Sequence, residues 1–263
     1  MKNLFLILVF SVTIFGASGK AQVVKSVEND IVRFVYTGGD IFNSFTEFSE
    51  PTQIRLAASI VAIAGAYSLD YNLKDFAGHA RSGFTDKLFS LDKVYGSGYT
   101  LIGIAGLYGY GVIFQNGEVR KIGLQTIEAV GYAGLITTVL KSVVGRSRPY
   151  TGEAHSMLRP FNVHAATTSF PSGHSTVAFA VSTVLANNTD NIYLKILSYT
   201  AASLVAYSRI YHNDHWFSDV VAGGAIGYFV GDFVSHDTQR STFSNPNFSF
   251  YYLPNTIGVT VRF

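Results

Sequence analysis

The stretch of the chain richest in potential chemistry runs from Ser208 to Asp219, directly before an apolar helical pattern that extends from Val220 toward Phe233. If the chain is helical from Trp216 onward, His215 and Asp219 stand four residues apart on one face. An aspartate at that spacing can hold one imidazole nitrogen and leave the other free to attack an electrophile. The alternative is that Asp219 only caps its helix and that His215 is a core histidine with a satisfied ring.

A second stretch, Lys141 to Pro149, places the cations Lys141 and Arg148 seven residues apart, on one face of a helix that continues between them. Pro149 favours an extended backbone at Arg148. A lysine offers a point charge, and an arginine offers a planar fork that matches phosphate oxygens. The pair suits an oxyanion, although a basic helix end is also favoured by the helix dipole alone.

The third stretch, Pro171-Ser172-Gly173-His174, opens an apolar pattern over Ser175 to Leu185. Ser172 is the expected helix cap. The first amide groups of a helix have no partner within it and attract anions, and Gly173 lets a ligand come close. His174 would lie beside that anion. The alternative is an ordinary capped helix with an incidental histidine.

Together, the three stretches resemble the signature of the type 2 phosphatidic acid phosphatase superfamily, which shares its site with bacterial class A acid phosphatases and vanadium haloperoxidases. The resemblance covers about residues 141–219. It implies that His215 attacks phosphorus to form a phosphohistidine, that Asp219 holds its ring, and that His174 protonates the leaving oxygen. It also implies a set of groups that bind the phosphate oxygens: Lys141, Arg148, Ser172, Gly173 and Arg209.

Nearby residues that could be mistaken for site residues do not fit this pattern. His212 and Asp214 lack a suitable partner at four-residue spacing, and Arg159-Pro160 has Gly152 where a lysine would be needed. The segment from Tyr150 to Ser169 joins two of the stretches without an evident helix or strand pattern. It is either a substrate-facing lid or an ordered structural loop. The polar residues that such a lid would carry are Glu153, His155, Arg159 and His164.

The composition indicates export and contact with a membrane. Of the 263 residues, 48% are hydrophobic and only 14% charged, which implies a large core or a membrane surface. Lys2, an apolar run over residues 4–15 and the small residues 16–19 have the layout of a signal peptide, predicted over residues 1–21. The alternative, a retained anchor, is opposed by an apolar run shorter than the roughly 20 residues that span a bilayer. We therefore expect a periplasmic, membrane-associated protein.

Charge and cysteine content exclude other classes of protein. Residues 22–263 carry 17 basic and 17 acidic side chains, so no large basic face suggests nucleic acid as a partner. The chain has no cysteine, which excludes disulfides and thiolate chemistry. We expect no cofactor and no metal, because three cations of the implied site occupy the role that a metal would fill.

The apolar patterns predict an all-α bundle of about six core helices over residues 22–240, the expected phosphatase domain. Short helical pieces should cover Gln22 to Phe48, a helix should start at Ser49-Glu50-Pro51, and Asn72 to Lys93 should be a polar, solvated connection. Val94 to Gly117 has no charged residue and is the best candidate for a membrane span, with glycines at 103, 106 and 109 that would let another helix approach. Alternating residues in the tail, 241–263, predict a short β-hairpin packed on the bundle.

Several functions are compatible with these features. The first is a metal-independent phosphomonoesterase that acts on a lipid phosphate or pyrophosphate. The same residues fit an acid phosphatase for small soluble phosphoesters, or a vanadate-dependent haloperoxidase in which His215 binds vanadate. A protein that only binds phosphate or lipid would need neither His174 nor Asp219, so we do not expect one.

Overall fold

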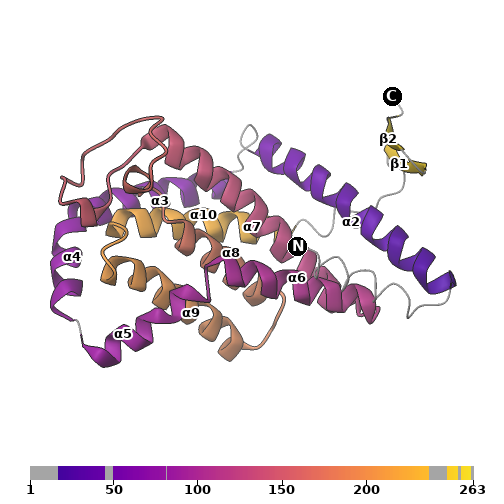
Figure 1. The fold of residues 1–263 in the computed structure, drawn as a ribbon, viewed down its shortest axis with the longest axis horizontal. Coiled ribbons are helices and arrows are strands. Elements are labelled where there is room, and N and C mark those ends of the chain that lie inside the picture. Colours follow the sequence, from indigo (N-terminus) through magenta and orange to yellow (C-terminus); the bar gives the residue numbers. More distant parts are fainter. Residues whose placement is uncertain (1–16, 45–49, 81, 237–247, 254–255, 262–263) are drawn as a thin grey trace.

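The computed structural model describes residues 17–44, 50–80, 82–236, 248–253 and 256–261. Its body is an all-α bundle, which confirms the predicted fold class, but the described residues hold nine α-helices where the sequence predicts about six (Figure 1). These are α2 (Ala17–Ser44), α3 (Glu50–Ser68), α4 (Asp70–His79), α5 (Gly83–Phe89), α6 (Gly98–Ile113), α7 (Gly117–Val144), α8 (Gly173–Asn187), α9 (Ile192–Tyr211) and α10 (Phe217–His236). Three short 3-10 turns join them: η1 (Ser90–Lys93), η2 (Pro149–Thr151) and η3 (Ala165–Thr167).

Helix α8 lies at the centre of the bundle, in contact with α7, α9 and α10 (Figure 1). It supplies small and aliphatic side chains to the main core, and α7 and α10 supply the rest of its centre. The buried members from these three helices are Ala129, Val130, Ala133, Ala180, Val181, Val184, Val230 and Val234. Burial of this apolar surface is the main force that holds the helices together.

Glycines bring α8 and α10 unusually close to each other. A Cβ atom at Gly223 would come within 2.4 Å of the Ser172 carbonyl oxygen, and one at Gly227 within 2.3 Å of the Thr176 carbonyl oxygen. No side chain fits at these distances, so the backbones are in direct contact. The same contact lets the Ser172 amide donate to the Asp219 carbonyl at 2.9 Å.

Helix α2 is continuous through Thr37-Gly38-Gly39-Asp40, where the sequence predicts a break between short helical pieces. Thr37 is buried, and Gly38 lies so close to Tyr132 that a Cβ atom would come within 2.9 Å of its hydroxyl oxygen. Packing against α7 therefore outweighs the roughly 1 kcal/mol by which a glycine disfavours a helix. The predicted break is wrong for this reason.

The predicted polar connection over residues 72–93 is also wrong, because most of it is helical. Helix α5 starts with a capping box, in which Ser82 Oγ accepts from the Thr85 amide and Thr85 Oγ1 accepts from the Ser82 amide. Not all of its charges are solvated. Asp92 is 2% exposed and pairs with a residue of α9, a partner that no local sequence pattern reveals.

The stretch predicted as the best membrane span forms a shorter helix than expected. Helix α6 has 16 residues, about 24 Å at 1.5 Å per residue, which is less than the roughly 30 Å of a bilayer core. Ser97 caps its start, and Gln115, with a positive φ of 54°, follows its end. The three glycines predicted to admit another helix have no described atom within 4 Å of a Cβ position, whereas Gly111 lies directly against Arg120 of α7.

By length and composition, α7 and α10 are the two single helices in the described part of the chain that could cross a membrane. A third candidate consists of residues 52–68 and 70–79, from α3 and α4, which are bent by 59° at the break between them. As predicted, α3 starts with Glu50 and Pro51 in its first turn. Its end at Ser68 places Asp70, the first residue of α4, in the protein interior.

The structure does not test the predictions made for the two ends of the chain. The predicted signal peptide falls largely on residues 1–16, which lie outside the described residues. The strands β1 (Phe248–Leu253) and β2 (Thr256–Val261) are antiparallel, with Phe248 opposite Val261. Residues 237–247, which link α10 to β1, are not described. A hairpin packed on the bundle therefore stays a prediction, as do the domain limits.

A glycine in the contact between α8 and α10 and a glycine at an open position should respond differently to substitution by alanine. Gly227→Ala forces the two backbones apart and should lower the free energy of unfolding by about 1–3 kcal/mol, the usual cost of overpacking. Gly106→Ala, at an open position of α6, should be neutral or stabilising by up to about 1 kcal/mol. Thermal unfolding of both variants in the same detergent measures the difference. A Gly227→Ala protein that unfolds at the wild-type temperature would contradict the close contact.

Candidate active site

The three stretches singled out in the sequence meet at one end of the bundle. The Ser172 amide donates to the Asp219 carbonyl, which joins the stretch at residues 171–174 to the stretch at residues 208–219. A Cβ atom at Gly173 would lie 3.8 Å from Lys141 Cε, which places the stretch at residues 141–149 against the stretch at residues 171–174. Helix α7 ends at Gly145, whose φ of 61° and contact with the Arg159 carbonyl leave no room for a side chain. The chain then turns, and Arg148 is extended before Pro149, as predicted.

His215 lies in the short connection between α9 and α10 and is only 3% exposed. Its Nδ1 atom stands 3.7 Å from Asp219 Oδ2, close but beyond hydrogen-bonding distance, and it has no hydrogen-bond partner among the described residues. Burial lowers the pKa of His215 to about 3; the Asp219 carboxylate opposes this shift, and the charges of Lys141 and Arg148 add to it. At neutral pH the ring is uncharged and retains a lone pair, as a nucleophile requires.

Asp219 is fully buried and does cap its helix, as the alternative interpretation holds. Its Oδ2 atom accepts from the Trp216 amide at 2.9 Å and from Ser169 Oγ at 2.5 Å. The same oxygen faces His215. The two interpretations of the sequence are therefore compatible, because one carboxylate both caps α10 and stands beside the imidazole.

The second carboxylate oxygen of Asp219 is bound by Arg146, which is bound in turn by Asp70. The sequence analysis identified neither residue. Arg146 is 3% exposed, and its Nη1 atom donates to Asp219 Oδ1 at 2.6 Å while Nη2 donates to Asp70 Oδ2 at 2.6 Å. The position of Arg146 between Lys141 and Arg148 was the one available signal. Asp70 lies 76 residues earlier and gave none.

Arg209 is fixed by two carboxylates. Its Nη1 atom donates to Asp92 at 2.5 Å and Nη2 to Asp214 at 2.6 Å. Asp214, set aside in the sequence as lacking a partner, and Asp92, predicted to be solvated, therefore both contact a residue of the expected site. His212, also set aside, lies at the edge of this group, with Nε2 3.3 Å from the Phe89 carbonyl oxygen.

Lys141 and Arg148, in contrast, form no ion pair with a carboxylate in the part of the chain that the structure describes. Lys141 Nζ donates to the Thr168 carbonyl at 2.5 Å. Arg148 donates to the carbonyls of Ala165 at 2.8 Å and Asp214 at 3.4 Å. In addition to burial, the charges of both residues lower the pKa of His215. Two partly buried cations with only neutral acceptors can hold an anion beside that histidine.

The start of α8 agrees with the predicted cap. Ser172 Oγ accepts from the Ser175 amide at 3.4 Å and from Ser175 Oγ at 2.9 Å. Gly173 and His174 are the first two residues of the helix. Burial lowers the pKa of His174 to about 4, the charge of Arg209 adds to this shift, and Asp92 and Asp214 oppose it.

The segment from Tyr150 to Ser169 is an ordered loop in the structure. Arg159 forms a bidentate pair with Glu153, at 2.6 Å for each bond, and donates to Ser147 Oγ. The His155 ring stacks on Tyr67 with a centroid distance of 4.2 Å. These contacts favour the structural-loop interpretation over a lid and place Glu153, His155 and Arg159 in the support of the site.

Comparisons with known proteins agree with the signature. A lipid A 1-phosphatase of Porphyromonas gingivalis is 27% identical over 191 residues, which cover 70% of this chain but only 38% of that protein. An undecaprenyl-diphosphatase of Sulfolobus acidocaldarius is 28% identical over 182 residues, 66% of this chain and 82% of that protein. The crystal structure of Aquifex aeolicus LpxE has a TM-score of 0.51 and 27% identity, covering 63% of this chain and 94% of that one.

The sequence profile of the PAP2 superfamily matches residues 123–243. This range holds the three stretches, the helices α8 to α10 and all but the first residues of α7. The match, the similar proteins and the shared fold agree with one another, and residues 123–243 of the chain are similar to the PAP2 superfamily.

Proposed function

We propose that this protein is a metal-independent phosphatase that removes phosphate from a lipid phosphate or pyrophosphate through a phosphohistidine. The observation that carries the proposal is the pair Lys141 and Arg148, two partly buried cations that have no carboxylate partner among the described residues and lie beside the neutral His215. Arg209, Ser172 and the Gly173 amide complete the phosphate site. The cations would stabilise the charge that spreads over the phosphoryl oxygens in the transition state.

The reaction has two steps. In the first, His215 Nε2 attacks phosphorus because Nδ1 faces Asp219; the N–P bond forms, the bond from phosphorus to the lipid oxygen breaks, and His174 gives that oxygen a proton. In the second, water attacks phosphorus and releases inorganic phosphate, the N–P electron pair returns to His215, and His174 takes a proton from the water. Asp219 would stabilise the ring while it carries positive charge.

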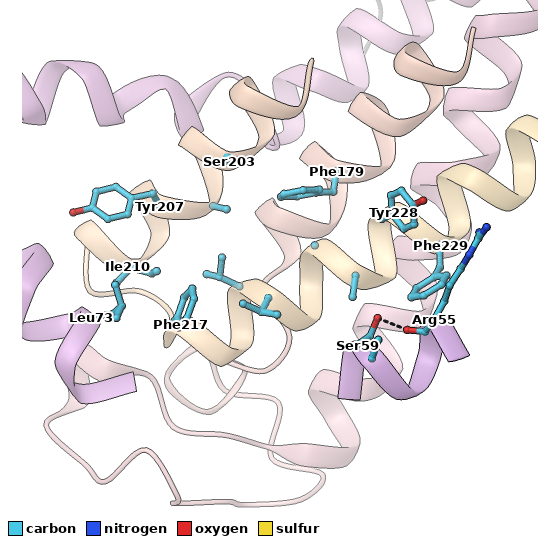
Figure 2. A pocket seen from close by; sticks show the side chains of 16 residues that line it. Arg55, Ser59, Leu73, Phe179, Ser203, Tyr207, Ile210, Phe217, Tyr228 and Phe229 are labelled. Carbon is cyan, nitrogen blue, oxygen red and sulfur yellow. Dashed lines mark hydrogen bonds between the residues drawn. The ribbon is translucent and has the colours of Figure 1, made fainter. Parts of the chain in front are cut away.

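Apolar surface around the site supports a lipid substrate over a soluble ester. A cavity of about 720 Å³ lies between α3, α4, α8, α9 and α10, lined mainly by aliphatic and aromatic side chains (Figure 2). Ile210 and Val220 line it and directly follow Arg209 and Asp219 in the chain. We propose that it accepts the hydrocarbon chain of the substrate. The names of the two similar proteins, a lipid A 1-phosphatase and an undecaprenyl-diphosphatase, point to the same class.

Exposed apolar side chains on the helices support membrane association. Leu135 and Val139 of α7, and Ile196 and Leu197 of α9, are each more than half exposed. Such surfaces are stable against lipid and costly in water. With the predicted signal peptide, they favour an exported protein whose bundle lies in or on a membrane and whose site faces the periplasm.

The function is tested by the loss of one histidine. We expect His215→Ala to lose at least three powers of ten in phosphate release from a lipid phosphate, because a nucleophile is removed. His212→Ala, in the same connection, should remain close to wild type. The assay uses purified protein in detergent, with lipid phosphate, isoprenyl pyrophosphate and a soluble ester, each with and without chelator. Activity that chelator abolishes and magnesium restores would contradict the metal-free mechanism.

The pH profile tests His174. Its pKa of about 4 applies to a site without a bound anion, whereas a phosphate dianion favours the protonated ring and raises the pKa. The profile of kcat reports the enzyme–substrate complex, and that of kcat/KM reports the free enzyme. We therefore expect kcat to fall with rising pH at a higher pH than kcat/KM does. His174→Ala should lack this limb, and identical limbs for the two parameters would exclude His174 as the acid.

The cavity predicts that chain length affects binding. Ser203 is exposed on α9 and lines the cavity. A tryptophan in its place would exclude about two methylene groups of a bound chain, worth roughly 0.8 kcal/mol each. Ser203→Trp should thus raise KM for a long-chain lipid phosphate about tenfold and leave a short soluble ester unaffected, with Ser203→Ala as the control. An equal change for both substrates would contradict a chain-binding role.

A further inference from the structure

We propose that Asp70 and Arg146 are positioning residues for the catalytic pair, acting through Asp219. This inference rests on the proposed reaction of His215. Among the described residues, neither Asp70 nor Arg146 forms a side-chain hydrogen bond with a residue of the proposed phosphate site. Their contacts instead form a buried relay that runs from the bend between α3 and α4 to the carboxylate beside the nucleophile.

The guanidinium of Arg146 forms hydrogen bonds within this relay through all three of its nitrogens. It bridges two carboxylates at 2.6 Å each, donates from Nε to the His155 carbonyl at 2.7 Å, and donates from Nη1 to Ser218 Oγ at 2.7 Å. The rings of Tyr67 and Trp216 lie 5.1 and 5.6 Å from its central carbon. A planar fork satisfies both carboxylates together, and a lysine at the same position could not.

Asp70 fixes the start of α10 from a different helix. Its Oδ1 atom accepts from the Ser218 amide at 2.8 Å, and Oδ2 accepts from Ser218 Oγ at 2.9 Å and contacts His155 Nδ1 at 3.2 Å. Helix α10 begins at Phe217, after a tryptophan that cannot cap it with a side-chain oxygen. Two carboxylates accept the early amides instead: Asp219 takes that of Trp216, and Asp70 takes that of Ser218.

These contacts determine which way the Asp219 carboxylate faces. Oδ1 is bound to Arg146, so Oδ2 is left for Ser169, Trp216 and the side that faces His215. If Arg146 lost its anchor on Asp70, the carboxylate could rotate away from the imidazole. The phosphate-binding cations would stay in place, so the chemical step should suffer while phosphate affinity does not.

The test is a double-mutant cycle in single-turnover kinetics with a lipid phosphate. We expect Asp70→Asn to lower the rate of phosphohistidine formation about 10- to 100-fold, the range seen when residues that orient site ligands are changed, with KM within about twofold. In an Asp219→Asn background the same change should cost less than about twofold, because the carboxylate that it positions is gone. Arg146→Lys should behave like Asp70→Asn, and Arg146→Gln should be worse.

Two controls separate positioning from a general loss of stability. Asp75→Asn changes an exposed carboxylate of the same helix, and Arg120→Lys weakens a partly buried arginine–aspartate pair with Asp30, remote from the site. Both should leave the rate within about twofold. Equal fold-losses for Asp70→Asn in the wild-type and Asp219→Asn backgrounds would overturn the proposal.

A readout that needs no turnover keeps this test separate from that of the proposed function. In protein labelled with ¹⁵N-histidine, the His215 signals are identified by their absence in His215→Ala. Asp70→Asn and Asp219→Asn should shift the Nδ1 resonance in the same direction, and the double variant should match Asp219→Asn. A wild-type protein with no phosphatase activity would refute the proposed function, whereas an Nδ1 resonance unmoved by Asp70→Asn would refute this inference.

Discussion

The architecture of the site depends on the buried guanidinium of Arg146 and its two carboxylates. A buried ion pair offsets the cost of desolvation only when its geometry is good and its remaining hydrogen-bonding groups are satisfied. Here every nitrogen of the guanidinium has a described acceptor. Removing one partner of such a group typically costs about 3–5 kcal/mol. Helix α4, the loop after α7 and the start of α10 are therefore tied to one point.

This constraint explains why the loop over residues 150–169 is ordered although its sequence shows no regular pattern. The His155 carbonyl accepts from Arg146, and its ring stacks on Tyr67 of α3. Further along, the Arg159 amide donates to the Gly145 carbonyl at 2.8 Å, and the Arg148 amide donates to the Ala166 carbonyl at 2.9 Å. A loop with its own backbone bonds satisfied is held in place, and Arg148 is held with it.

The sequence was sufficient for the parts of the site that rest on local rules. The Ser172 cap and the extended Arg148 before Pro149 each follow from the behaviour of a helix end or a proline. The all-α class likewise followed from apolar periodicity. These features involve residues close to one another in the chain.

What the sequence could not reveal depends on distant partners. Asp92 lies in the segment predicted to be polar and solvated, and Asp70 lies just before that segment. Only the fold brings them to Arg209 and Arg146. In the same way, the break predicted at Gly38 does not occur, because Gly38 packs against Tyr132. Tyr132 lies on another helix, so the local sequence does not reveal this contact. The length of α6 was overpredicted because an uncharged run does not show where a cap and a left-handed residue end the helix.

The pairing of charges explains how one site can bind an anion and also supply a proton. Arg146 and Arg209 each engage two carboxylates, so each of these groups carries one excess negative charge when its carboxylates are ionised. Lys141 and Arg148 together balance that excess, so the charges of these groups sum to about zero when His174 is uncharged. A phosphate dianion would upset this balance, and protonation of His174, the proposed general acid, would restore part of it. The general acid would thus become protonated when the substrate that needs its proton is bound.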